Sequence, residues 1–192
     1  MASFGHAPLI LASASPRRRD LLAQIGIVPA RIAPTDIDET RRKDESPRAL
    51  AERLAREKAV ACDADGFVLA ADTVVALGTR NLEKAENAAE AEAFLRLLSG
   101  RSHQCITGIA VKAPDGRLQS RTVLARVRMK RITDQEIAAY VASGEWPGKA
   151  GGYGIQGMAG AFVTHINGSY TTIVGLPLYE TKSLLEGMGW RG

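Results

Sequence analysis

A long apolar segment in the middle of the chain, Phe67 to Leu77, constrains the fold more than any other part of the sequence. Its residues are mainly Val, Leu and Ala at both odd and even positions, which is typical of a strand buried on both faces in the centre of a sheet. Asp72 interrupts this segment. Burying a carboxylate is costly unless it is paired or binds a metal, so Asp72 is a candidate functional residue. The alternative is an aspartate at a strand end that caps a loop.

Strand and helix signals alternate before this segment. Short apolar runs at 8–12 and 31–33 predict strands. Ser15-Pro16 and Ser46-Pro47 follow them, and each pair joins a good N-cap residue to a proline at the first helical position. A strand–helix–strand–helix order favours parallel strands joined by crossover helices.

Hairpin signals appear later in the chain. Pro114-Asp115-Gly116 predicts a turn, and Asn167-Gly168 predicts a hairpin between strands at 161–166 and 169–174. Hairpins join antiparallel strands, so the sheet must contain both kinds of neighbour. The sequence therefore predicts an α/β fold, a mixed sheet with flanking helices, in a single domain over residues 1–192.

The segment from Ser13 to Arg18 links the first predicted strand to the first predicted helix. Small residues there let backbone N–H groups approach a ligand, and a helix N-terminus attracts anions. Arg17 and Arg18 add the fork geometry that suits phosphate oxygens. The alternative is a capped helix with a solvated basic first turn, although arginines at a helix N-terminus oppose the helix dipole.

Further polar candidates lie in loops. Asp36, Asp38 and Glu39 form a carboxylate cluster that suits Mg²⁺ or Mn²⁺, and a solvated acidic loop is the alternative. Lys58 falls near the end of the second predicted helix and Lys84 follows the apolar strand, and either lysine alone is more often a surface charge.

The glycine-rich loop, residues 149–157, reads KAGGYGIQG. Its glycines allow close backbone approach to a ligand. Tyr153 has two interpretations, stacking on a base or packing in the core, and Gln156 is placed to read a base edge or to position a phosphate.

Composition excludes several classes of protein. The net charge of +4 is mild and scattered, which fits an anionic substrate but is too small to argue for nucleic-acid binding. The two cysteines, Cys62 and Cys105, fit neither a zinc site nor a secreted disulfide scaffold, so buried thiols are predicted. No signal-peptide pattern and no apolar run long enough to span a membrane is present, so a cytoplasmic protein is expected.

Several blocks together resemble the Maf family, once called septum formation inhibitors, from about Leu9 to Glu186. The blocks occur in the family's order and are LASASPRR (11–18), REKA (56–59), ADTVV (71–75), YGIQG (153–157) and GSY…VGLP (168–177). Ala85 departs from the pattern, because family members usually carry proline there. The resemblance implies a Maf fold with a deep cleft between two lobes, similar in shape to the inosine triphosphate pyrophosphatases.

The resemblance also implies an activity and roles for single residues. It implies metal-dependent hydrolysis of a nucleoside triphosphate to the monophosphate and pyrophosphate, with Mg²⁺ or Mn²⁺ as cofactor and a homodimer as assembly. Asp72 matches the catalytic base, and Glu39 with Asp72 would hold the metal. The positions that match the specificity or cleft residues of the family are Arg17, Thr73, Gln156, Ser13, Arg18, Lys58 and Lys84. The YGIQG block resembles the branch that prefers dTTP and UTP rather than 7-methyl-GTP.

Two other functions remain open on the sequence. A nucleic-acid-binding or regulatory protein acting in septation is the first, and the older family name points to it. A phosphomonoesterase, which would release orthophosphate, is the second.

Overall fold

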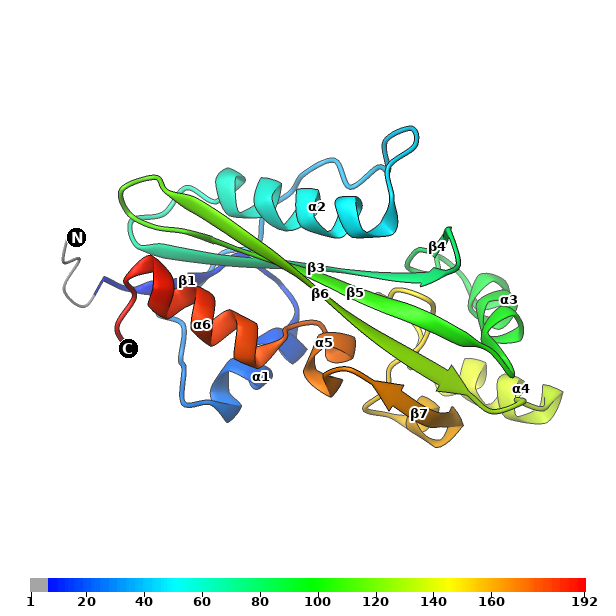
Figure 1. Cartoon of the computed structure of the whole chain (residues 1–192). Helices are drawn as coiled ribbons and strands as arrows, with labels where there is room; N and C mark the ends of the chain where they lie inside the picture. The colour runs from blue at the N-terminus through cyan, green and yellow to red at the C-terminus, as the bar shows by residue number, and fades with distance from the viewer. Residues whose placement is uncertain (1–6) are drawn as a thin grey trace.

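The computed structural model describes residues 7–192. Residues 1–6 lie outside this part, so the structure describes the predicted single domain of residues 1–192 only from residue 7 onward. The chain forms a strongly twisted mixed sheet with helices on both of its faces (Figure 1). This arrangement confirms the predicted α/β class with a mixed sheet and flanking helices.

Seven strands form the sheet, in the order β2-β1-β3-β5-β6-β7, with β4 paired to β3. β1, β2 and β3 are parallel, and the other pairs are antiparallel. The strands are β1 (Leu9–Leu11), β2 (Arg31–Ile32), β3 (Phe67–Leu77), β4 (Arg80–Leu82), β5 (Ser102–Lys112), β6 (Leu118–Met129) and β7 (Val163–Asn167).

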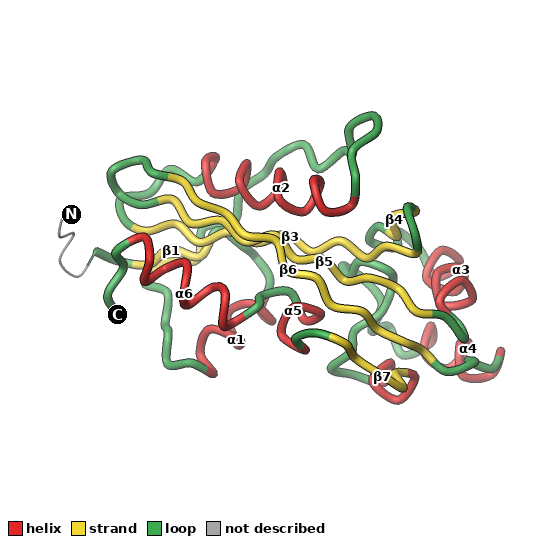
Figure 2. Tube along the Cα trace, in the orientation of Figure 1, coloured by secondary structure: helices red, strands yellow, loops and turns green. Residues whose placement is uncertain are grey.

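The helices divide between the two faces of the sheet. α2 covers one face, and α1, α5 and α6 lie on the other, while α3 and α4 lie at the far end of the sheet (Figures 1 and 2). The helices are α1 (Pro16–Gln24), α2 (Pro47–Ala61), α3 (Ala88–Leu98), α4 (Asp134–Ala142), α5 (Tyr170–Val174) and α6 (Leu178–Met188), with a 3₁₀ turn at Met158–Phe162.

β3 is the central strand that its composition predicts. Most of its residues are buried, because helices cover both of its faces. Asp72 pairs with Gly108 of β5, so both residues face the same side of the sheet. A Cβ atom on Gly108 would lie 2.1 Å from the carbonyl oxygen of Ala51 in α2. Glycine is therefore needed there for α2 to approach the sheet, and the register directs Asp72 toward α2.

The edge of β3 is open over a short central stretch. β1 pairs with β3 only as far as Leu69, and β4 pairs with it only from Val75 onward. In the described structure, Ala70 to Val74 therefore have no strand partner on that side. Side chains from both faces of β3 can reach the space beside this stretch.

The predicted second hairpin is wrong. β7 ends at Asn167, and the residues expected to form its partner strand are helix α5. β7 pairs with β6 instead, and Gly168, at φ +110°, packs within 3.0 Å of the β6 backbone when a Cβ is placed on it. The β-branched residues of α5 favour a strand, but tertiary contacts outweigh this preference. One such contact is the hydrogen bond that Thr107 of β5 donates to the Thr172 carbonyl.

Two smaller features follow the sequence. Cys62 and Cys105 are free and buried, as predicted. Thr133 and Glu136 form a complete capping box at the start of α4. Within residues 7–192, no helix has the length and apolar character required to cross a bilayer.

Candidate active site

A pocket of about 460 Å³ lies beside the open edge of β3. It is lined by the loop after β1, the loop after β2, the middle of β3, the glycine-rich loop and α5. All of the site residues that the family resemblance implies line it, namely Ser13, Arg17, Arg18, Glu39, Lys58, Asp72, Thr73, Lys84 and Gln156. Asp36 and Asp38 do not line the pocket, and Asp38 instead accepts a hydrogen bond from the backbone of Thr40.

A network of two lysines and two carboxylates forms one wall of the pocket. Lys58 lies in the last turn of α2, is 8% exposed, and donates to Asp72 Oδ1 at 2.6 Å. The same ammonium lies 2.7 Å from Glu39 Oε1, and Lys84 lies 3.1 Å from Glu39 Oε2. Lys58 is thus a buried bridge between two carboxylates rather than a surface charge.

The position of Asp72 follows from this network. Its side chain is nearly buried, and the ammonium of Lys58 offsets the cost of burying the charge. Burial acts to raise the pKa of Glu39, but hydrogen bonds and charge from Lys58 and Lys84 outweigh it and lower that pKa. The pocket therefore holds Glu39 in its ionised form, beside the Asp72 carboxylate that pairs with Lys58.

These carboxylates fit a divalent cation only in combination with other ligands. Within residues 7–192, no group of three or more His, Cys, Asp or Glu is placed to hold a metal ion. Mg²⁺ is commonly held by one or two carboxylates together with substrate phosphates and water. Glu39 and Asp72 satisfy that requirement, provided that the substrate supplies the remaining oxygens.

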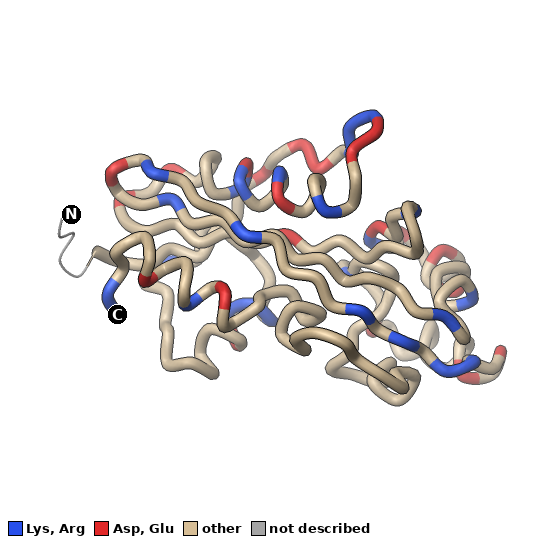
Figure 3. The backbone as a smooth tube through the Cα atoms, viewed as in Figure 1, with Lys and Arg blue, Asp and Glu red and all other residues tan. Residues whose placement is uncertain are grey.

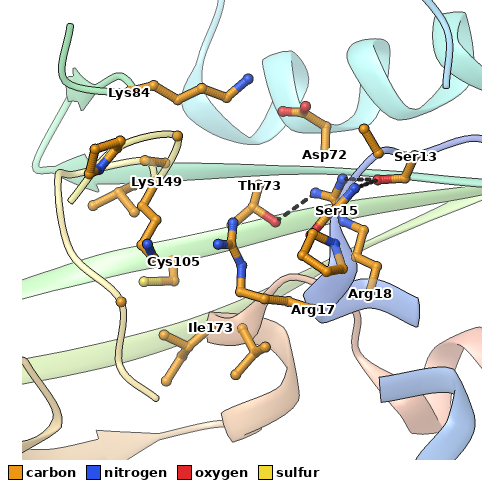
Figure 4. A pocket seen from close by; sticks show the side chains of 18 of the residues that line it. Ser13, Ser15, Arg17, Arg18, Asp72, Thr73, Lys84, Cys105, Lys149 and Ile173 are labelled. Carbon is orange, nitrogen blue, oxygen red and sulfur yellow. Dashed lines mark hydrogen bonds between the residues drawn. The ribbon is translucent and has the colours of Figure 1, made fainter. Parts of the chain in front are cut away.

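Arg18 fixes the phosphate loop, residues 13–18, to the rest of the pocket. Its guanidinium donates to the Gly175 carbonyl at 2.9 Å, Ser13 Oγ at 3.0 Å and Thr73 Oγ1 at 3.3 Å (Figure 4). All three acceptors are neutral. Burial lowers the pKa of Arg18, although nearby Asp72 opposes this effect. Its positive charge is therefore held in place by neutral acceptors, and no salt bridge among residues 7–192 involves it.

Arg17 is a second cation without a counter-ion. It is partly buried, and burial lowers its pKa. Across the part of the chain that the structure describes, no salt bridge involves it. Two arginines at the start of α1, both aimed into a pocket, favour the anion-site interpretation over a solvated basic turn.

The glycine-rich loop forms the opposite wall. Tyr153 is buried, and its hydroxyl lies 2.7 Å from His103 Nε2, so its second interpretation, as a core residue, holds. Gln156 is exposed at the pocket. Lys149 and Cys105 also line the pocket, although no role for either was predicted from the sequence. The signal for Lys149 was its place in the glycine-rich loop, whereas nothing in the sequence places Cys105 beside a ligand.

His103 anchors Tyr153 from behind the pocket. The ring is 2% exposed, and burial lowers its pKa to about 4 from 6.5. Burial likewise raises the pKa of the Cys105 thiol to about 12, against a smaller opposing effect of its hydrogen bond to Tyr153. Both groups are therefore neutral at pH 7, so neither His103 behind the pocket nor Cys105 in its wall adds charge to the site.

The neutral state of His103 makes the fold sensitive to acid. Because the folded-state pKa lies below the unfolded value, the unfolded chain binds the proton first as the pH falls. The contribution of neutral His103 to the free energy of unfolding is fully present above about pH 6.5. It decreases by up to about 3 kcal/mol as the pH falls from 6.5 to 4. His103→Gln, which cannot titrate, is expected to lose this part of the pH dependence in urea unfolding. Parallel curves for the two proteins would contradict the assignment.

Comparison with known proteins gives the family. The family model described as Maf-like protein matches residues 8–188. A protein named dTTP/UTP pyrophosphatase from Hyphomonas neptunium is 80% identical, covering 97% of this chain and 98% of that one. A protein of the same name from Caulobacter vibrioides is 60% identical, covering 95% and 96%.

A solved structure, a HAM1 protein from Coxiella burnetii, has a TM-score of 0.44 at 18% identity and covers 65% of this chain and 73% of that one. This partial likeness carries no weight for the function. The family match extends over nearly the whole chain and includes every residue that lines the pocket. The chain belongs to the Maf family.

Proposed function

We propose that this protein hydrolyses dTTP and UTP to the nucleoside monophosphate and pyrophosphate, with a divalent cation as cofactor. The names of its relatives support the substrates. The observation that carries the chemistry is the nearly buried Asp72 carboxylate at the open edge of β3, with the cations Lys58, Lys84 and Arg18 around it. A pocket with this charge distribution suits a polyanion that reacts next to a carboxylate.

The phosphate loop would bind the phosphate chain. The N-terminus of α1 presents free backbone N–H groups, and Arg18 supplies a fixed positive charge. Lys58 and Lys84 would neutralise further charge that accumulates on the leaving pyrophosphate. These groups are held in position before the substrate binds, so little reorganisation is needed during the reaction.

Asp72 would act as the general base. Lys58 occupies its Oδ1, which leaves Oδ2 to accept a proton from an attacking water. The water oxygen bonds to the α-phosphorus while the bond from that phosphorus to the bridging oxygen breaks, and pyrophosphate leaves. Glu39 and Asp72 would hold the cation, which when bound polarises the phosphoryl oxygens.

Product analysis tests the proposal. The purified protein is incubated with dTTP, UTP, dCTP, dATP or dGTP in the presence of Mg²⁺ or Mn²⁺, and pyrophosphate and orthophosphate are measured separately. We expect pyrophosphate with dTTP and UTP, and little with the other nucleotides. Release of orthophosphate in place of pyrophosphate would contradict the proposal, and release of orthophosphate from dTMP would indicate a phosphomonoesterase instead.

Nucleic-acid binding is the competing function. Basic residues recur along β6 at Arg121, Arg126 and Arg128, with no acidic residue in that strand, whereas both signs of charge alternate along α2 (Figure 3). These basic residues lie on one strand away from the pocket, whereas the cations of the pocket lie beside carboxylates, which favours a small anionic ligand over nucleic acid there. Tight, strongly salt-dependent binding in a gel-shift titration, without nucleotide hydrolysis, would favour that function over ours.

A further inference from the structure

Lys149 is a cation in the pocket that the proposed reaction does not use. Its ammonium donates to the Glu145 backbone carbonyl, and no salt bridge within residues 7–192 involves it. Burial and the charge of Arg17 lower its pKa, with Glu145 opposing them. A partly buried cation beside a second unpaired cation is unfavourable unless a ligand supplies acceptors.

The chain leaves space for the Lys149 side chain. A Cβ atom placed on Gly154 would lie 2.8 Å from Lys149 Cε and 2.9 Å from its Cδ. The lysine stem therefore crosses the backbone of Gly154, and Gln156 Oε1 lies 3.9 Å from the same Cβ position. Glycine at 154 lets Lys149 and Gln156 share one side of the pocket.

Several contacts hold this loop in place before any ligand binds. The Glu145 carboxylate accepts from the backbone N–H of Met158 at 3.1 Å, and Ala150 forms a bridge with Lys84 beside β4. The Gly154 N–H donates to the Tyr140 hydroxyl at 3.0 Å. A preformed loop positions Lys149 with little loss of entropy on binding, as a recognition site requires.

Lys149 lies at the end of the pocket away from the phosphate loop. Figure 4 places Lys149 and Cys105 at one end and Ser13 and Arg18 at the other, with Thr73 and Arg17 between them. Phosphates bound at Ser13 and Arg18 would put the base of the nucleotide toward Lys149. The inference therefore rests on the proposed function, which sets this orientation.

We propose that Lys149 determines specificity by donating a hydrogen bond to a ring carbonyl oxygen of a pyrimidine-dione base, thymine or uracil. An ammonium group has three donors and no acceptor. Thymine and uracil carry two ring carbonyls, whereas cytosine carries an amino group in place of one of them. If cytosine bound in the same position, its amino group would face the Lys149 ammonium. Both groups are hydrogen-bond donors, so neither would find an acceptor in this partly buried pocket and binding would weaken.

Lys149→Met tests this role, because methionine keeps the length of the side chain and removes its donors. We expect kcat/KM for dTTP to fall by about 10- to 100-fold, the effect of losing a hydrogen bond to a charged group. The value for dCTP should change little, so the preference for dTTP over dCTP falls by the same factor. Lys182→Met, at an exposed pair with Glu186 on α6, is the matched control and should keep that preference.

A second variant moves Lys149 without removing it. The φ of Gly154 lies outside the left-handed region, so alanine fits the backbone there and its Cβ displaces only the flexible lysine stem. Gly154→Ala should therefore lower the preference for dTTP over dCTP in the same direction, and by less. An unchanged preference in both variants would overturn the assignment. An equal loss for dTTP and dCTP would also overturn it, because it places Lys149 on the phosphates.

Binding of the products separates this inference from the proposed function. dTMP and dCMP carry the base without the pyrophosphate, and their affinities are measured by calorimetry for the wild type and Lys149→Met. Selective loss of dTMP affinity supports the role of Lys149 even if the wild type releases no pyrophosphate from dTTP. Equal losses for the two monophosphates contradict it, whatever the wild-type activity is.

Discussion

Replacement of Asp72 by asparagine is expected to lower kcat for pyrophosphate release from dTTP by about 1,000-fold, within the range that general bases contribute. Asparagine keeps the shape of the side chain but can neither accept the proton nor bind a cation strongly. Asp72→Ala should be at least as damaging, because it also removes a partner of Lys58. Steady-state assays at saturating dTTP and Mg²⁺ measure the effect.

Two comparisons make this result specific. Asp65→Asn changes an exposed aspartate away from the pocket and should leave kcat unaltered. The unfolding midpoint in urea shows whether Asp72→Asn still folds, since Lys58 retains its contact with Glu39. Near-normal turnover in a folded Asp72→Asn and in Asp72→Ala would rule out Asp72 as the catalytic group.

Removal of divalent cations is expected to reduce activity to background, and added Mg²⁺ or Mn²⁺ should restore it. The ammonium of Lys58 lies within 2.7 Å of both candidate ligand carboxylates. A cation entering the free protein must compete with this ammonium, whereas substrate phosphates add ligands and favour its entry. We therefore expect weak Mn²⁺ binding without nucleotide and much tighter binding with a non-hydrolysable dTTP analogue, measured by electron paramagnetic resonance.

Lys58→Met extends this prediction. The variant leaves Glu39 and Asp72 without the shared ammonium, so Mn²⁺ should bind more tightly than in the wild type when no nucleotide is present. Lys182→Met serves as the control, because its ammonium pairs with Glu186 on the surface of α6. Full activity in chelator, or Mn²⁺ affinity that is unaffected by both nucleotide and Lys58→Met, would contradict a cation held by Glu39 and Asp72.

Local signals account for the parts of the fold that the sequence predicted well. The apolar run from Phe67 to Leu77 is β3, and Ser15-Pro16 and Ser46-Pro47 start α1 and α2. These features depend on composition and capping within a few residues. The hairpin at Asn167-Gly168 failed because β6 pairs with β7 and α5 packs on β5, and those contacts come from distant parts of the chain.

The site was predicted as a set of residues but not as an arrangement. Motif resemblance brought together residues that do line one pocket. It could not show that Lys58 joins Asp72 to Glu39, nor that Lys149 lies across Gly154, because both contacts depend on how α2 and the glycine-rich loop pack against β3. The homodimer, the cytoplasmic location and the bound cation stay predictions.

The gap between β1 and β4 lets two successive residues of one strand reach the same ligand from opposite sides. Asp72 and Thr73 are neighbours in sequence, yet they project from opposite faces of β3 into one cavity. Asp72 meets α2 through Lys58, and Thr73 meets α1 through Arg18. Under the proposed function, a single strand would thus present the Asp72 carboxylate to one side of the substrate and, through Thr73, the phosphate-binding Arg18 to the other. Because the charges of Asp72 and Arg18 act on each other across the strand, a substitution at either position is expected to alter the behaviour of the other.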